Sequence, residues 1–230
     1  MVASLDRDIH VYSESEETSG TVLISGLRSS FQTVRSASDP RGIRICIDVL
    51  ATRGLFGVPA GELANTVIEL SELTPSIREV EEHLECPKIE DVFKAIDDFF
   101  TGQEDQHRTK RRPRQELVWV WNQILASDGT LRVSDLASEL GWSRRHLTEQ
   151  FRKEFGITTK HALRVVQFEH ACARLKYMPT IDLAQLACDA GFSDQAHLSR
   201  AWTEFTGWSP TKWLQHEFPF IQDNEVAALR

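Results

Sequence analysis

The sequence predicts a protein of two parts: a small α+β domain, followed by an all-α domain of two helix-turn-helix motifs joined by a spacer helix. Three observations support this prediction. A pattern of residues recurs with an offset of 50 to 51 positions in the C-terminal half. The charge changes sign between the two halves. A polar, charged segment that ends at Pro113 separates them. Such a segment is typical of an interdomain linker.

The charge distribution gives the boundaries of the two parts. Residues 1–107 contain nine lysines and arginines against twenty aspartates and glutamates, a net charge of −11. Residues 108–220 contain sixteen against twelve, a net charge of +4. We expect an α+β sensor or interaction domain at 1–101, a linker at 102–113, the helical domain at 114–217 and a tail at 218–230. The linker's basic cluster could touch DNA phosphate, although a solvated linker is the simpler interpretation.

The first part has short mixed patterns. The first twenty residues are polar and acidic, a composition typical of disorder. The runs 21–25 and 42–49 have the β-branched, apolar character of strands. A turn is predicted at 55–59, and amphipathic helices are predicted at 77–84 and 89–100.

The repeat in the second part has a recognisable layout. The first copy contains Leu136-Ala137, Gly141-Trp142-Ser143, His146-Leu147, Phe151 and Gly156; the second contains Leu186-Ala187, Gly191-Phe192-Ser193, His197-Leu198, Trp202 and Gly207. The offset grows by one because the second copy has one extra residue between its serine and its histidine. Repeats of this length usually mark a duplicated supersecondary unit.

Each copy predicts a helix, a tight turn and a second helix. The glycine suits a left-handed helix end, and the serine is a preferred N-cap. The following helix places an apolar residue every four positions on one face. This is the layout of a helix-turn-helix, whose second helix enters the DNA major groove. Two unrelated helical hairpins are the alternative. An apolar helix across residues 158–175 would join the copies.

Composition excludes several classes of protein. No apolar run approaches the ~20 residues of a membrane span, and the N-terminus lacks signal-peptide character. The four cysteines are dispersed without metal-ligand spacing, as expected of reduced thiols in a cytoplasmic protein. We find no nucleophile elbow, phosphate-binding loop, zinc-protease motif or dinucleotide fingerprint. We therefore predict no catalytic residues, no metal, no cofactor and no enzymatic activity.

The tandem pattern and the closing segment 205–210 resemble the DNA-binding domain of AraC/XylS-type transcription regulators. The resemblance covers about residues 118–217, and the run 191–200 is close to that family's second motif. The segments 55–63 and 218–223 also resemble a subgroup with a small N-terminal domain.

The resemblance implies two recognition helices that face successive major grooves, one helical turn or ~34 Å apart. The residues it places at base edges are Arg144, Arg145, Thr148, Glu149, Arg152, Asp194, Gln195, Ser199 and Arg200. Those it places at phosphates are Ser143, Lys153, Lys160, Thr203 and Lys212.

Side-chain chemistry refines these roles. The Arg145 fork suits a guanine edge, the Gln195 amide suits adenine, and Arg200 suits guanine or phosphate. Glu149 departs from the basic or amide residue that the family often has there, although a carboxylate can accept from cytosine. Asp194 could instead only cap its helix.

Some of these residues also have a structural interpretation. Solvated surface is the alternative for Arg144 and Arg152. We expect His146 and His197, which occupy the same repeat position, to be packed structural residues and not metal ligands.

These features predict a sequence-specific transcription regulator, which the family resemblance favours as an activator. Its partners would be double-stranded DNA, RNA polymerase, a small-molecule effector sensed by the N-terminal domain, and a second copy in a homodimer. The alternative is a weak DNA binder that acts as a co-regulatory protein-interaction factor.

Overall fold

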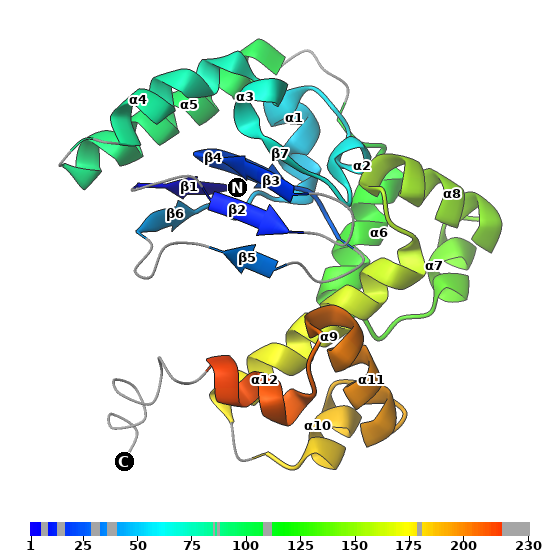
Figure 1. Cartoon of the computed structure of the whole chain (residues 1–230). Helices are drawn as coiled ribbons and strands as arrows, with labels where there is room; N and C mark the ends of the chain where they lie inside the picture. The colour runs from blue at the N-terminus through cyan, green and yellow to red at the C-terminus, as the bar shows by residue number, and fades with distance from the viewer. Residues whose placement is uncertain are drawn as a thin grey trace. The chain divides into compact units, whose positions relative to one another are not determined.

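The computed structural model (Figure 1) describes residues 1–5, 9–12, 17–28, 33–35, 41–84, 86, 88–107, 112–178 and 181–217. These residues form two compact units. One contains the described residues up to Trp119 together with Arg145–Thr158, and the other contains Val120–Arg144 and the described residues from Thr159 onward.

The first unit contains two antiparallel sheets. Its strands are β1 (Val2–Ser4), β2 (Ile9–Tyr12), β3 (Glu17–Gly20), β4 (Val22–Ser25), β5 (Thr33–Arg35), β6 (Gly42–Arg44) and β7 (Val67–Glu69). One sheet has the order β6-β1-β4-β7 and the other has the order β3-β2-β5. The central strand β4 is buried on both faces, because Val22 and Ile24 face one core while Leu23 packs with Ile9 and Val11 of the other sheet.

Helices cover the face of the larger sheet on which Val22 and Ile24 lie (Figure 1). They are α1 (Thr52–Phe56), α2 (Ala60–Leu63), α3 (Leu70–Leu73), α4 (Arg78–Leu84) and α5 (Ile89–His107), with 3-10 turns at Val49–Ala51 and Pro75–Ile77. Leu55, Leu70, Val80 and Ile96 pack with Val22 in one core. The predicted α+β class of the N-terminal part is therefore confirmed.

The expectation of disorder in the first twenty residues is wrong for those that the structure describes, since they include β1, β2 and β3. A short alternating pattern in the sequence does indicate the strand β2. Ile9 and Val11 are buried while His10 between them is exposed, and this alternation is what a half-buried strand requires.

Two further local predictions need correction. The strand expected at 42–49 ends at Arg44, and the side chain of Asp48 accepts a hydrogen bond from the Leu50 backbone N–H, which starts a 3-10 turn. The turn expected at 55–59 is half helical, because α1 runs to Phe56 and ends at Gly57 with φ 74°.

The expected linker begins inside a helix. α5 continues to His107, so residues 102–107 are helical. Gln103 explains the extension: it is 2% exposed, and its amide donates to the hydroxyls of Thr74 and Ser76 at 2.9 and 2.7 Å. Residues 108–111, with the basic cluster, and the tail at 218–230 lie outside the described residues.

The remaining helices are α6 (Gln115–Ala126), α7 (Val133–Glu139), α8 (Arg144–Phe155), α9 (Thr159–Tyr177), α10 (Leu183–Asp189), α11 (Gln195–Thr206) and α12 (Pro210–Glu217). Each copy of the repeat thus forms two helices with a glycine between them, and α9 is the predicted spacer. Gly141 and Gly191 take φ 65° and 74°, so the predicted left-handed helix ends are confirmed.

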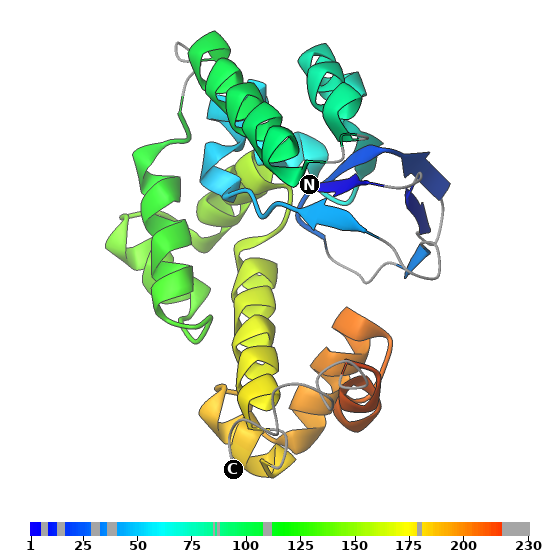
Figure 2. The ribbon, with the colours of Figure 1, turned by 90° about the vertical axis from the view of Figure 1, so that its left-hand side faces the viewer.

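In the second unit, α9 leads into a cluster of α10, α11 and α12 (Figure 2). Its core contains Leu175, Leu186, Leu198 and Trp202. The buried Gln167 amide on α9 donates to the carbonyl of Ala190 at 3.0 Å. This hydrogen bond anchors the turn between α10 and α11 to the spacer helix.

Candidate nucleic-acid interface

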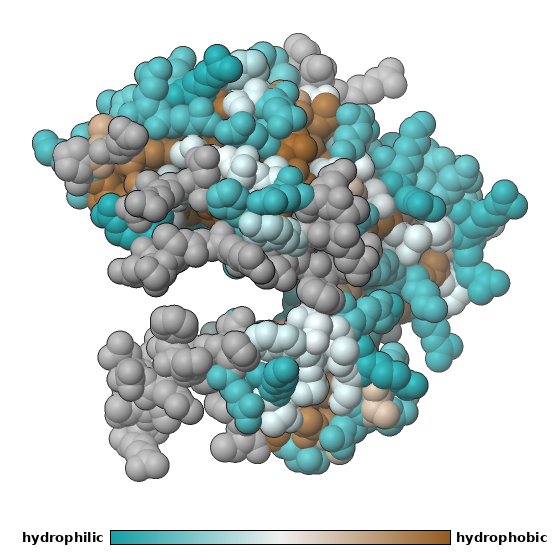
Figure 3. All heavy atoms as spheres, viewed as in Figure 1, coloured by the Kyte–Doolittle hydropathy of each residue, from teal (hydrophilic) through white to brown (hydrophobic). Residues whose placement is uncertain are grey.

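The helix α8 has one buried and one exposed face. Leu147, Phe151 and Phe155 are 0% exposed, and their spacing of four residues places them on one side. Figure 3 shows hydrophilic atoms gathered over the region of α8. The base-readout candidates on this helix are exposed, except for the half-buried Thr148: Arg144, Arg145, Glu149 and Arg152. Ser143 and Lys153, predicted at phosphates, are exposed as well.

The exposed side of α11 carries the candidates of the second copy. Gln195, Arg200 and Thr203 are exposed, and Ser199 is half-buried. Lys160 on α9 and Lys212 on α12 are also exposed, and the Lys212 ammonium lies 5.6 Å from the centre of the Trp208 ring. Arg145, Thr148, Glu149 and Arg152 belong to one compact unit, whereas Arg144 and the α11 candidates belong to the other.

The N-cap of α11 is Asp194 and not Ser193, which corrects the predicted cap. The Asp194 carboxylate accepts from the His197 backbone N–H at 2.6 Å and from the Ser193 hydroxyl at 3.1 Å. These two hydrogen bonds lower the pKa of Asp194. The extra residue of the second copy moves an aspartate into the position that holds serine in the first. The carboxylate therefore takes the capping role that we gave as its alternative.

The two repeat histidines differ in their surroundings. The His197 ring stands edge-on to Phe192, with centroids 5.2 Å apart, and its Nδ1 lies 3.2 Å from the Ser193 hydroxyl. This agrees with a packed, structural histidine. His146 is exposed. Across the described part of the chain, no group of three or more histidine, cysteine or acidic side chains could hold a metal ion.

Sequence reasoning missed an ion pair at the end of α8. Glu154 is only 8% exposed, and its two carboxylate oxygens accept from Nε and one terminal nitrogen of Arg53 on α1, at 2.7 and 2.9 Å. The hydrogen bonds to Glu154 raise the pKa of the Arg53 guanidinium. The sequence did contain one indication that Glu154 has a special role. With the offset of 51 residues, Glu154 occupies the repeat position of the aromatic Phe205.

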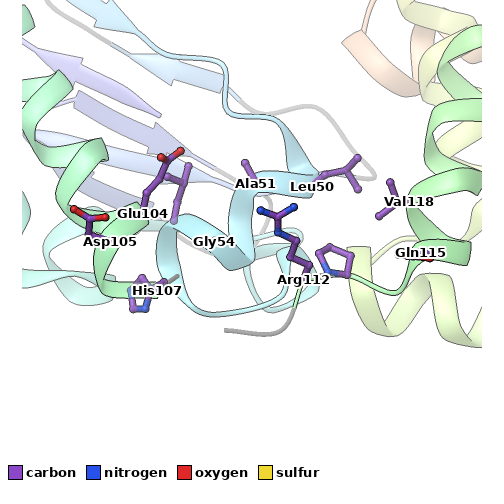
Figure 4. Close-up of a pocket in the computed structure, with 11 residues that line it drawn as sticks. Leu50, Ala51, Gly54, Glu104, Asp105, His107, Arg112, Gln115 and Val118 are labelled. Carbon is purple, nitrogen blue, oxygen red and sulfur yellow. The ribbon is translucent and has the colours of Figure 1, made fainter. Parts of the chain in front are cut away.

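The first unit also contains an open pocket of about 760 Å³ beside α1 (Figure 4). Its apolar lining comes from Leu50, Ala51, Gly54, Leu55, Pro113 and Val118. Its polar lining comes from the end of α5, with Glu104, Asp105 and His107, and from Arg112 and Gln115. Its size lies within the range of small-molecule sites.

Comparison with known proteins agrees with the geometry of the second half. A family model described as a helix-turn-helix domain matches residues 136–216. This range contains both copies of the repeat and the spacer helix. The helix-turn-helix region expected from the repeat is therefore matched by this family model.

The relatives of this helix-turn-helix region are transcription regulators by name. An uncharacterised HTH-type transcriptional regulator of Staphylococcus aureus is 32% identical over 98 residues, which is 43% of this chain. The Msm operon regulatory protein of Streptococcus mutans is 32% identical over 95 residues. The matched parts span 13% and 32% of those relatives, so the chain covers a minor share of their length.

Structures of similar fold extend across most of the chain. The structure of ToxT from Vibrio cholerae aligns with 93% of this chain and 88% of its own, with a TM-score of 0.54 and 15% identity. A structure of ToxT bound to an unsaturated fatty acid aligns with a TM-score of 0.51. The architecture of a small sheet region followed by a helical domain is therefore shared beyond the helix-turn-helix region.

No helix in the described ranges is long and apolar enough to cross a membrane.

Proposed function

We propose that this protein is a sequence-specific DNA-binding transcription regulator that reads two successive major grooves with α8 and α11. The observation that carries the proposal is the matched geometry of the two copies. In each, a buried apolar face holds a helix whose arginine or amide side chains are exposed. Such helices read base edges in the major groove.

The readout side chains divide between the helices. On α8, Arg145 is suited to a guanine edge; on α11, Gln195 is suited to adenine and Arg200 to guanine or phosphate. Ser143, Lys153, Lys160, Thr203 and Lys212 contact phosphates in this proposal. The helical half has a modest positive charge, so base readout and the pairing of half-sites must provide most of the selectivity.

Selection from a random DNA library with the full chain, at a stated salt concentration, tests the proposal. We expect a motif of two half-sites about 10 base pairs apart. Arg145→Ala should cost about 1–3 kcal/mol and relax one half-site, and Arg200→Ala should do the same at the other. Arg78→Ala, at an exposed arginine on α4, is the control. If the folded protein selects no motif, the proposal fails.

We also propose that the pocket beside α1 receives an effector. Leu50, Leu55 and Val118 offer an apolar wall, and Arg112 offers a cation, a combination that suits an amphiphilic acid. Gly54→Trp should fill the pocket, since a Cβ at Gly54 has no atom within 4 Å among the described residues. Compounds that raise the melting temperature of the wild type should not raise that of Gly54→Trp. An equal shift in both proteins would exclude this pocket.

A co-regulatory role through protein contacts is the second candidate. The exposed Glu149 on α8 favours it, because a carboxylate on a DNA-reading face repels phosphate. The strongly acidic N-terminal half also suits a protein partner more than nucleic acid. Absence of a selected DNA motif, together with loss of regulation on N-terminal substitution, would favour this candidate.

A further inference from the structure

The contact between α1 and the end of α8 has unusual chemistry for its position. In the second copy, the residue equivalent to Glu154 is Phe205. Its ring centroid lies 4.9 Å from that of Phe168 on the spacer helix and 5.5 Å from the guanidinium carbon of Arg164. The first copy thus has a carboxylate where the second has an aromatic ring. A buried carboxylate is unfavourable unless it is paired, and its partner here is Arg53.

The backbone around this ion pair is also closely packed. A Cβ added at Gly61 on α2 would lie 2.9 Å from both the Gly156 nitrogen and the Lys153 carbonyl oxygen. A Cβ added at Gly156 would lie 2.0 Å from the Ala64 Cβ. Only glycine at positions 61 and 156 lets the segment that follows α1 approach the end of α8 this closely.

The contact leaves the candidate DNA-reading face of α8 uncovered. Arg144, Arg145 and Arg152 are exposed, whereas Glu154 is buried on the side that meets α1. A contact that blocked DNA would have to cover the arginines. This one instead fixes the opposite side of the helix.

We propose that Arg53 and Glu154 are positioning residues through which the N-terminal unit holds the first recognition helix in its DNA-reading orientation. The proposal rests on the proposed function for its DNA readout, and it assigns a regulatory route to the same interface. Two parallel hydrogen bonds between a guanidinium and a carboxylate fix direction as well as distance. A change in α1 therefore moves α8.

The experiment compares Arg53→Gln and Glu154→Gln with Glu204→Gln in the full chain. Glu204 is the matched control, because it also accepts two hydrogen bonds from one arginine, Arg164, but within the second unit. Affinity is measured for the selected operator and for two operators with one half-site scrambled. Circular dichroism confirms that each variant is folded at the assay temperature.

We expect both Arg53→Gln and Glu154→Gln to weaken binding to the intact operator by about tenfold. The loss should vanish on the operator whose α8 half-site is scrambled and persist on the other. Glu204→Gln should not show this half-site dependence. The exchanged pair, Arg53→Glu with Glu154→Arg, should recover part of the affinity. A loss shared equally by both half-sites, or no loss, would overturn the proposal.

Hydrogen exchange without DNA separates this proposal from the proposed function. Glu154→Gln should accelerate the exchange of α8 amides more than that of α4 and α5 amides, and Glu204→Gln should leave α8 unchanged. Unchanged α8 exchange in Glu154→Gln overturns the positioning role even if the protein binds DNA. Accelerated α8 exchange in a protein that selects no motif leaves the positioning role standing and rejects the DNA-binding function.

Discussion

The back face of α11 packs into the core of its own unit through Leu198, Ala201 and Trp202, whereas the back face of α8 includes Glu154, whose partner Arg53 lies in the N-terminal part of the chain. The same repeated pattern therefore produces two helices with different support. In α11, apolar packing and the Asp194 cap are both local. In α8, a paired charge and close glycine contacts tie the helix to α1 and α2. The two helices thus share a buried apolar face and differ in their additional support.

Truncation of the buried aromatic residues behind α11 and α8 should give the largest loss of stability and should show which unit each helix depends on. Trp202→Ala and Phe151→Ala each remove a side chain that is 0% exposed and should each cost about 3–5 kcal/mol. Hydrogen exchange should locate the damage from Trp202→Ala in α9–α12 and that from Phe151→Ala in the unit that contains α1–α5. If both variants lose protection over all helices alike, the two units unfold together, and the conclusion that α8 and α11 have different support is wrong.

Glycine substitutions should give the next largest effect. Gly141 and Gly156 both have positive φ, 65° and 78°, so alanine costs about 1–2 kcal/mol of backbone strain at either. Gly156→Ala should cost about 1–3 kcal/mol more because its Cβ meets that of Ala64. Urea denaturation measures the difference. Ala64→Gly in the Gly156→Ala background should restore most of that extra loss; equal costs at both glycines would contradict the close approach.

Acidification should reveal the local support of α11 with the smallest effect. Hydrogen bonds lower the pKa of Asp194 in the folded protein, so the charged cap stabilises the fold above the ordinary pKa of aspartate, and this contribution is lost as pH falls through the lowered value. The melting temperature of wild type should exceed that of Asp194→Asn at pH 7, and the gap should close below about pH 4. A gap that is constant with pH would show that the charge plays no part in the cap.

The helical half was predictable because its signals are local. A glycine at a left-handed helix end and apolar residues spaced by four determine helices without reference to distant residues, and α7–α11 follow them. The N-cap of α11 escaped prediction because two neighbouring residues, Ser193 and Asp194, could both cap. Only the geometry of the turn selects between them.

The N-terminal part was harder for a physical reason. Its strands have three or four residues each, too short for a periodicity to be distinguished from chance, and their pairing is set by residues far apart in sequence. The Arg53–Glu154 pair spans 101 positions. No pattern within either segment identifies the partner, although the carboxylate at an otherwise aromatic repeat position indicates that one is needed.

The placement of Arg53 also bears on how the parts of this chain can be recombined with those of other proteins. A chimaera that joins residues 114–217 to a different sensor would keep Glu154 and lose its cation. If the new domain buried that position, Glu154 would be a buried carboxylate without its partner, a cost of several kcal/mol in other proteins. A functional graft would need either to carry α1 and α2 with it or to exchange Glu154 for an aromatic residue, as the second copy already has. In this protein the unit of exchange is thus larger than the helix-turn-helix segment defined by its sequence.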